Sequence, residues 1–140
     1  MATVGVEATI DVPAQHVWEA IADVGAVHQR LLPGRVAATR IDGDIRILTM
    51  PDGSQVQELI LAIDHDLRRM AYAVTDGQRL LLTYHQVAFQ VFDRGAQSRL
   101  VWLTDVLPHA LAAAVRARVE RGIVEMKETL EVNHRTAPTH

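Results

Sequence analysis

The sequence predicts an α+β protein in which a meandering antiparallel sheet packs against one long C-terminal helix. A strand pattern and two short helical patterns open the chain, a series of strand patterns broken by turn residues fills its middle, and a long helical pattern closes it. A sheet of this size needs cover for its apolar face. The C-terminal helix is the only predicted element long enough to provide that cover.

The first elements are a strand and two short helices. The segment "VGVEATI" (residues 4–10) alternates apolar and polar residues, as a strand does. Asp11 is then expected to cap a helix, and Pro13 to lie in its first turn. The apolar face of that helix is formed by Val17, Trp18, Ile21 and Val24. A second short helix is expected from Val27 to Leu32, before Pro33-Gly34.

The middle of the chain predicts six strands in a series of hairpins. Their segments are "RVAATRI", "DIRILTM", "SQVQELILAID", "RRMAYAV", "LLTYHQVAFQVF" and "RLVWLTDV". Turn signals separate most of them: Asp42-Gly43, "PDG" at 51–53, Asp76-Gly77 and "RGAQ" at 94–97. Strands joined by such short turns pair antiparallel.

The last element is a helix expected from about His109 to Val132. Its apolar residues fall on one stripe at helical spacing: Leu111, Val115, Val119, Gly122, Met126 and Leu130. This stripe predicts that the helix packs along the sheet. Residues 1–133 are expected to form one domain, and residues 134–140 a flexible tail.

Composition excludes several classes of function. The 140-residue chain has a net charge of -3 and no run of Lys or Arg, which argues against a nucleic-acid or anionic-membrane surface. It has no cysteine, and its seven histidines lack the short spacing of metal ligands, so neither a thiol site nor a metal site is expected. No apolar run approaches the roughly 18 residues of a membrane span, and a cytoplasmic location is expected without stable membrane insertion.

Three segments carry a resemblance to a known family. They are "VEATIDVPAQHVWEAIADV", "VQELILAIDHDLRRMAYAV" and "SRLVWLTDVLP". From Val4 to Val132 the chain resembles the START-related SRPBCC superfamily, which includes polyketide cyclase/dehydrase-like proteins and birch-pollen allergens. The resemblance implies a helix-grip fold, in which a seven-stranded antiparallel sheet wraps around the final helix. It also implies a cavity between them that binds lipids, sterols, hormones or polyketides, where some members close aromatic rings or dehydrate without a cofactor.

The hairpins predict which side chains face that cavity. With "RGAQ" as the last loop, residues 83, 85, 87 and 89 share the inner face with residues 102 and 104. A two-residue turn at Asp52-Gly53 would place Ile45, Ile47 and Thr49 inside with Glu58, and Arg46 outside. The residues expected to contact a ligand are Tyr72, Thr83, Val87, Phe89, Trp102, Thr104, Val119, Gly122 and Met126.

Glu58 and His85 are the two ionisable groups predicted inside, and each has two interpretations. Burial raises the pKa of a carboxyl and lowers that of an imidazole, so the pair could act as acid and base. Alternatively, Glu58 is structural, bonded to a backbone amide or an internal arginine, and His85 is a satisfied wall residue. Tyr72 could donate a hydrogen bond to a ligand and Trp102 could stack on it. Gly122 could leave space beside the cavity or ease close packing of the helix.

Two functions therefore remain open. The first is binding of a small hydrophobic or aromatic molecule, such as a lipid or a polyketide-like metabolite. The second is a cofactor-independent polyketide cyclase or dehydratase that uses Glu58 and His85. A third possibility is that side chains fill the cavity and the protein acts through its surface. The expected state is a monomer, or a homodimer formed through outer-face leucines and Tyr84.

Overall fold

The fold is a single curved sheet wrapped around a long helix. The structure is a computed structural model that describes residues 2–77 and 80–137. Its strands are β1 (Ala2–Ile10), β2 (Ala38–Asp42), β3 (Ile45–Thr49), β4 (Gln55–Asp64), β5 (Arg69–Asp76), β6 (Tyr84–Arg94) and β7 (Gln97–Leu107). Its helices are α1 (Ala14–Ala22), α2 (Val27–Arg30) and α3 (Ala112–Thr136), and a 3-10 turn, η1 (His109–Leu111), precedes α3.

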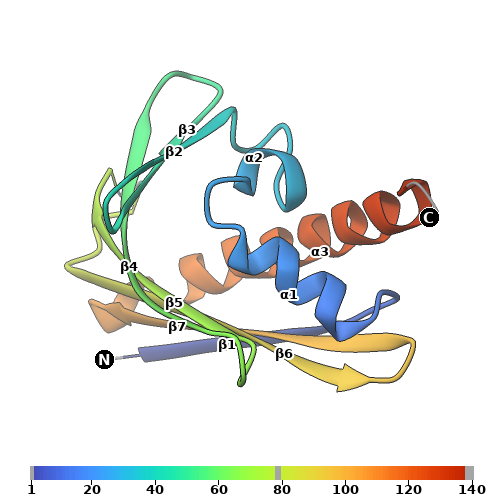
Figure 1. Cartoon of the computed structure of the whole chain (residues 1–140). Coiled ribbons are helices and arrows are strands. Elements are labelled where there is room, and N and C mark those ends of the chain that lie inside the picture. The colour runs from blue at the N-terminus through green and yellow to red at the C-terminus, as the bar shows by residue number, and fades with distance from the viewer. Residues whose placement is uncertain (1, 78–79, 138–140) are drawn as a thin grey trace.

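The seven strands form one antiparallel sheet in the order β1-β7-β6-β5-β4-β3-β2. Strands β2 to β7 make the predicted meander, and β1 joins the free edge of β7 from Ala2↔Val106 to Ile10↔Ser98. Register shifts in the β4–β5 pair, one of them between Ile60 and Ala62, add to the curvature of the sheet. Figure 1 shows all three helices on the concave side. The helix-grip fold predicted from the sequence is confirmed.

Helix α3 lies along the sheet through its predicted apolar stripe. Val115, Val119, Gly122, Met126 and Leu130 are buried, together with Ile123. The helix ends at Thr136 rather than near Val132, so residues 134–136 of the expected tail are helical. The last turn of the helix has no apolar pattern, so the sequence does not predict it. In the structure the Thr136 hydroxyl donates to the Val132 carbonyl at 2.9 Å. Residues 138–140 of that tail lie outside the described residues.

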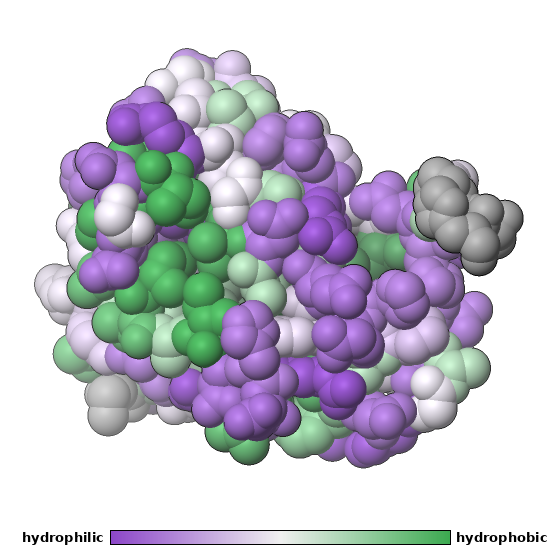
Figure 2. Space-filling model, viewed as in Figure 1, coloured by the Kyte–Doolittle hydropathy of each residue, from purple (hydrophilic) through white to green (hydrophobic). Residues whose placement is uncertain are grey.

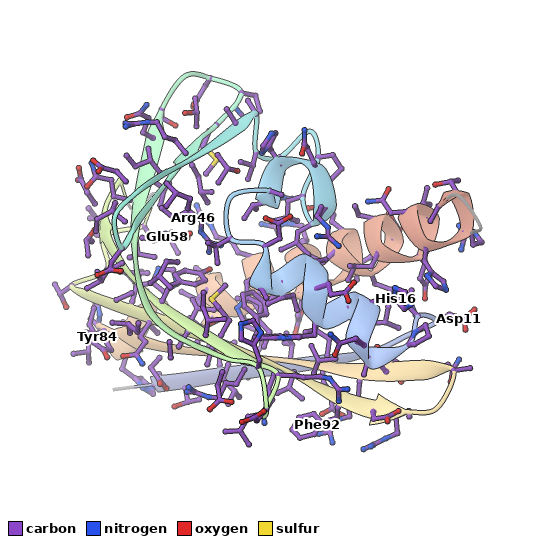
Figure 3. The ribbon with its side chains drawn as sticks, in the orientation of Figure 1. Asp11, His16, Arg46, Glu58, Tyr84 and Phe92 are labelled. Atoms are coloured by element: carbon purple, nitrogen blue, oxygen red, sulfur yellow. The ribbon has the colours of Figure 1, made fainter. Side chains whose placement is uncertain are left out.

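The predicted cap of α1 is wrong. The helix begins at Ala14, with Pro13 in the N-cap position and no side-chain cap hydrogen bond. Asp11 lies too far before the helix to cap it, and its backbone N–H instead donates to Glu131 Oε2 of α3 at 2.8 Å. This hydrogen bond ties the strand–helix junction, at the Asp11 labelled in Figure 3, to α3. The second short helix is also shorter than expected and ends at Arg30.

Helix α1 anchors the core at one end of the sheet. Trp18 is 2% exposed and packs in the main cluster with Met70, Leu100 and Met126. Its indole Nε1 donates to His65 Nδ1 in the β4–β5 turn at 3.1 Å. This end of the concave face is consequently filled by side chains.

The predicted register is correct for the β6–β7 hairpin and wrong for the β3–β4 hairpin. In the β6–β7 hairpin Arg94 pairs with Gln97, as expected, so the predicted inner face is confirmed. In the β3–β4 hairpin the two-residue turn is wrong, because Thr49 pairs with Gln55 and residues 50–54 form a wider loop. Met50 N donates to the Ser54 carbonyl at 2.8 Å and closes that loop. The shift of one residue brings Arg46, rather than its neighbours Ile45 and Ile47, onto the inner face opposite Glu58.

Candidate ligand-binding cavity

A cavity of about 460 Å³ lies between the concave face of the sheet and α3. Its walls come from the α2–β2 segment, from β3 to β7 and from α3. The aliphatic and methionine side chains of the lining are Leu32, Val36, Leu48, Met50, Val56, Val74, Leu80, Leu82, Val87, Val115 and Val119. Figure 2 shows apolar side chains gathered beside the β2–β4 end of the sheet, with hydrophilic residues around them.

Seven of the eleven predicted site residues line this cavity. They are Glu58, Tyr72, His85, Val87, Trp102, Val119 and Gly122. Thr83 is exposed just before β6, and Phe89, Thr104 and Met126 are buried outside the cavity. Phe89 and Met126 belong to the core under α1, where the Phe89 ring lies 4.8 Å from that of Trp102. Side chains of α1 and the core fill one half of the inner face, and the cavity occupies the other half. The alternation of residues along a strand shows which face is inner, but it does not show this division.

Glu58 forms a buried ion pair with Arg46. Arg46 Nε donates to Glu58 Oε1 at 2.7 Å, and the two side chains are only 4% and 5% exposed. Figure 3 shows both on the concave side of the sheet. The Arg46 guanidinium carbon also lies 4.9 Å from the centre of the Tyr72 ring. The interpretation that an internal arginine holds Glu58 is therefore confirmed, and the register error explains why Arg46 was not the predicted partner.

Burial dominates the electrostatics of this pair. It raises the pKa of Glu58, while the charge and the hydrogen bond of Arg46 act in the opposite direction. Burial and the nearby Glu58 carboxylate raise the pKa of Tyr72, so its phenol stays protonated and donates its hydrogen bond to Glu58. Arg46 Nη1 is buried without a hydrogen-bond partner among the residues that the structure describes.

His85 lines the cavity as a half-buried imidazole. Burial lowers its pKa, and the positive charge of Arg118 lowers it further. A neutral imidazole has one N–H donor and one nitrogen acceptor, so at neutral pH His85 can bind or exchange a proton with a polar ligand atom.

Gly122 allows Trp102 to pack directly on α3. A Cβ at position 122 would lie 2.9 Å from two ring atoms of Trp102, closer than carbon atoms pack. The indole fills the space that this glycine leaves, which supports the close-packing interpretation. Trp102 also lines the cavity, and its Nε1 is buried with no partner within the described part of the chain.

Three arginines that sequence reasoning missed also line the cavity: Arg35, Arg118 and Arg121. Arg35 lies in the α2–β2 segment and holds both carboxylate oxygens of Glu125 on α3, at 2.5 and 2.7 Å. Arg118 and Arg121 each precede a residue of the buried stripe on α3, Val119 and Gly122. Their position beside the apolar stripe is the one feature of the sequence that could have predicted them as lining residues.

Within residues 2–77 and 80–137, no cluster of three or more His, Asp or Glu side chains is arranged to hold a metal ion. Over the same residues, no helix has the length and apolar character needed to cross a membrane.

Comparison with known proteins decides the family. The model of the family "Polyketide cyclase / dehydrase and lipid transport" matches residues 1–131. The chain belongs to this family. No curated protein matches this chain at a significant level.

Solved structures share the fold at low sequence identity. An uncharacterised protein from Bacillus thuringiensis is 17% identical, with a TM-score of 0.82 over 92% of this chain and 98% of its own. A START superfamily protein from Mycobacterium smegmatis is 14% identical, with a TM-score of 0.73 over 94% and 95%. Norcoclaurine synthase from Thalictrum flavum, solved with dopamine and hydroxybenzaldehyde, is 18% identical, with a TM-score of 0.73 over 99% and 89%. At these identities the likeness establishes the fold alone.

Proposed function

We propose that this protein binds a small apolar molecule in the cavity between the sheet and α3. The observation that carries the proposal is the lining, in which eleven aliphatic or methionine side chains border a cavity of about 460 Å³. That volume lies within the range of about 300–1,000 Å³ that small-molecule sites occupy. A ligand that fills it gains about 0.8 kcal/mol for each methylene group removed from water, or about fourfold in Kd.

The polar groups of the cavity suit a ligand with one or two oxygen atoms. The neutral His85 imidazole is both donor and acceptor, and the Tyr72 phenol, which donates its proton to Glu58, can still accept a hydrogen bond. Norcoclaurine synthase, which has the same fold, is known in complex with two small aromatic molecules. This supports a comparable use of the cavity here, where Trp102 offers an aromatic surface.

The test is a ligand screen with a variant that fills the cavity. Thermal shift and native mass spectrometry would follow binding of fatty acids, alcohols, flavonoids and polyketides. Val74 lines the cavity, so we expect Val74→Trp to abolish the stabilisation seen with wild type. Val124 is 54% exposed on α3, and Val124→Trp serves as the matched control that keeps binding. If no compound binds wild type, or if Val74→Trp binds as wild type does, the proposal is wrong.

A cofactor-independent cyclase or dehydratase is the second candidate. The observation in its favour is that Glu58 and His85 line the same cavity. A neutral His85 could take a proton from a carbon next to a ligand carbonyl and hold it while the enolate reacts. Because Arg46 already engages Glu58, His85 is the better candidate for the base. With a bound polyketide as substrate, His85→Gln should abolish turnover and leave Kd within about twofold, whereas equal turnover would exclude this role.

A further inference from the structure

An ion pair beside the cavity joins the α2–β2 segment to α3. Arg35 Nε and Nη2 donate to the two carboxylate oxygens of Glu125, at 2.5 and 2.7 Å. Two parallel hydrogen bonds of this kind fix the orientation of both side chains. Arg35 also lines the cavity, so the ion pair holds part of the cavity wall in place.

A second pocket lies at the same part of the wall. Its residues come from the α2–β2 segment and from α3, and we call it the outer pocket: Leu32, Pro33, Gly34, Arg35, Glu125, Glu128 and Thr129. Leu32 and Arg35 line both the outer pocket and the main cavity. The side chain of Arg35 therefore forms part of the wall between the two spaces, and its movement would connect them.

This part of the wall is weakly held. The side chains of Arg35 and Glu125 are 45% and 42% exposed, so water competes for both and the ion pair stabilises the protein little. Gly34, the residue before Arg35, has a φ of +83°. Apart from its chain neighbours, nothing in the described part of the chain lies within 4 Å of where its Cβ would be. The backbone beside Arg35 is thus loosely packed.

Glu125 has a second arginine close to it. Arg121 lies one helical turn before Glu125 on α3, and it also lines the main cavity. The hydrogen bond from Arg35 lowers the pKa of Glu125, and the charges of Arg35 and Arg121 lower it further, against the effect of burial. If Arg35 moves away, Glu125 consequently keeps a counter-charge nearby.

From this arrangement we infer that Arg35 is a gate through which the ligand enters and leaves the cavity. In the closed state Arg35 holds Glu125 and separates the cavity from the outer pocket. In the open state Glu125 pairs with Arg121, Arg35 turns into solvent, and the ligand passes between the two spaces. This inference rests on the proposed function and concerns the exchange of its ligand.

The experiment measures exchange rates by stopped-flow fluorescence with N-phenyl-1-naphthylamine, a neutral apolar dye. Glu125→Gln weakens the closed state in the free and the bound protein alike. We therefore expect the association and dissociation rate constants to rise together, by up to about fivefold, while Kd stays within about twofold of wild type. Arg121→Gln removes the partner of Glu125 in the open state, so it should lower both rate constants.

The matched control is Asp23→Asn. Asp23 pairs with Arg30 on the surface, where the side chains are 47% and 39% exposed, and neither residue lines the cavity. Its exchange rates should equal those of wild type. A salt series needs no variant: raising the salt to about 0.5 M screens exposed charges, so it should accelerate exchange in wild type. The rates of Glu125→Gln should then change much less.

The outcomes separate this inference from the proposed function. If the dye binds but Glu125→Gln and high salt leave both rate constants unchanged, the gate is wrong and the cavity remains a binding site. If Asp23→Asn accelerates exchange as much as Glu125→Gln does, or if Arg121→Gln also accelerates it, the gate is wrong as well. If neither the dye nor any compound of the wider screen binds wild type, both proposals fail.

Discussion

The buried Arg46–Glu58 pair predicts that a single isosteric change, Glu58→Gln, strongly destabilises the protein. The side chains are 4% and 5% exposed and meet at 2.7 Å, so the substitution leaves a guanidinium charge in the interior without a counter-charge. Removing one partner of such a pair costs about 3–5 kcal/mol. Glutamine keeps the shape of the side chain and one acceptor oxygen, so we expect the lower end, about 3 kcal/mol. At about 3 °C per kcal/mol for a chain of this size, Tm should fall by about 10 °C.

Replacing both partners should have a much smaller effect. Apolar residues of similar volume remove the need to desolvate two charges, and such replacements are neutral or stabilising by about 1–4 kcal/mol. The pair also includes Arg46 Nη1, which is buried and has no partner in the described part of the chain. Arg46→Met/Glu58→Leu should therefore unfold at or above the urea midpoint of wild type.

The assay is urea unfolding followed by far-UV circular dichroism, with the m-value compared across variants. Glu7→Gln is the matched control, because Glu7 pairs with Arg99 on the sheet surface, where the side chains are 57% and 39% exposed. Its cost should be below about 1 kcal/mol. If Glu58→Gln costs no more than Glu7→Gln, or if the double replacement is as damaging as the single one, the reasoning about this buried pair is refuted.

Gly122, His65 and His85 each make a contact that a single substitution can test. Gly122→Ala gains about 1 kcal/mol of helix propensity, but its Cβ would lie 2.9 Å from the Trp102 ring, so calorimetry should show lower net stability and weaker ligand binding. His65→Ala leaves the buried Nε1 of Trp18 without its acceptor, and urea unfolding should show a loss of about 1–2 kcal/mol; no loss would mean that water replaces the imidazole. Folding lowers the pKa of His85 below 6.5, so between that lowered value and 6.5 the unfolded chain binds more protons and stability falls with falling pH. His85→Gln should flatten this part of the stability profile, and an unchanged profile would contradict the assignment.

Some features of the site could be predicted from local patterns. The short "RGAQ" loop determines the β6–β7 register, and that register places His85 and Trp102 inside as expected. Glu58 was placed inside correctly even though its predicted partners were wrong, because its own strand pattern identifies the apolar face. Local alternation therefore suffices wherever a strand has one apolar face and the adjoining turn has few possible geometries.

Other features depend on residues far apart in the chain. Phe89 and Met126 were expected in the site, but α1 packs over their part of the inner face and makes it core. The wider loop at residues 50–54 shifts β3 by one position and brings Arg46 to Glu58, an outcome that the turn dipeptide alone does not predict. Periodicity identifies a face of an element but not the segment that covers it.

The sequence by itself determined the order of the elements, the antiparallel meander and the apolar stripe of α3, because each depends on spacing within a short segment. Only the tertiary structure decided which half of the concave face is hollow, which charge neutralises Glu58, and which arginines line the cavity. Those features arise where α1, the β3–β4 loop and α3 meet the sheet. Their chemistry is set by distances between residues that the linear pattern does not relate to one another.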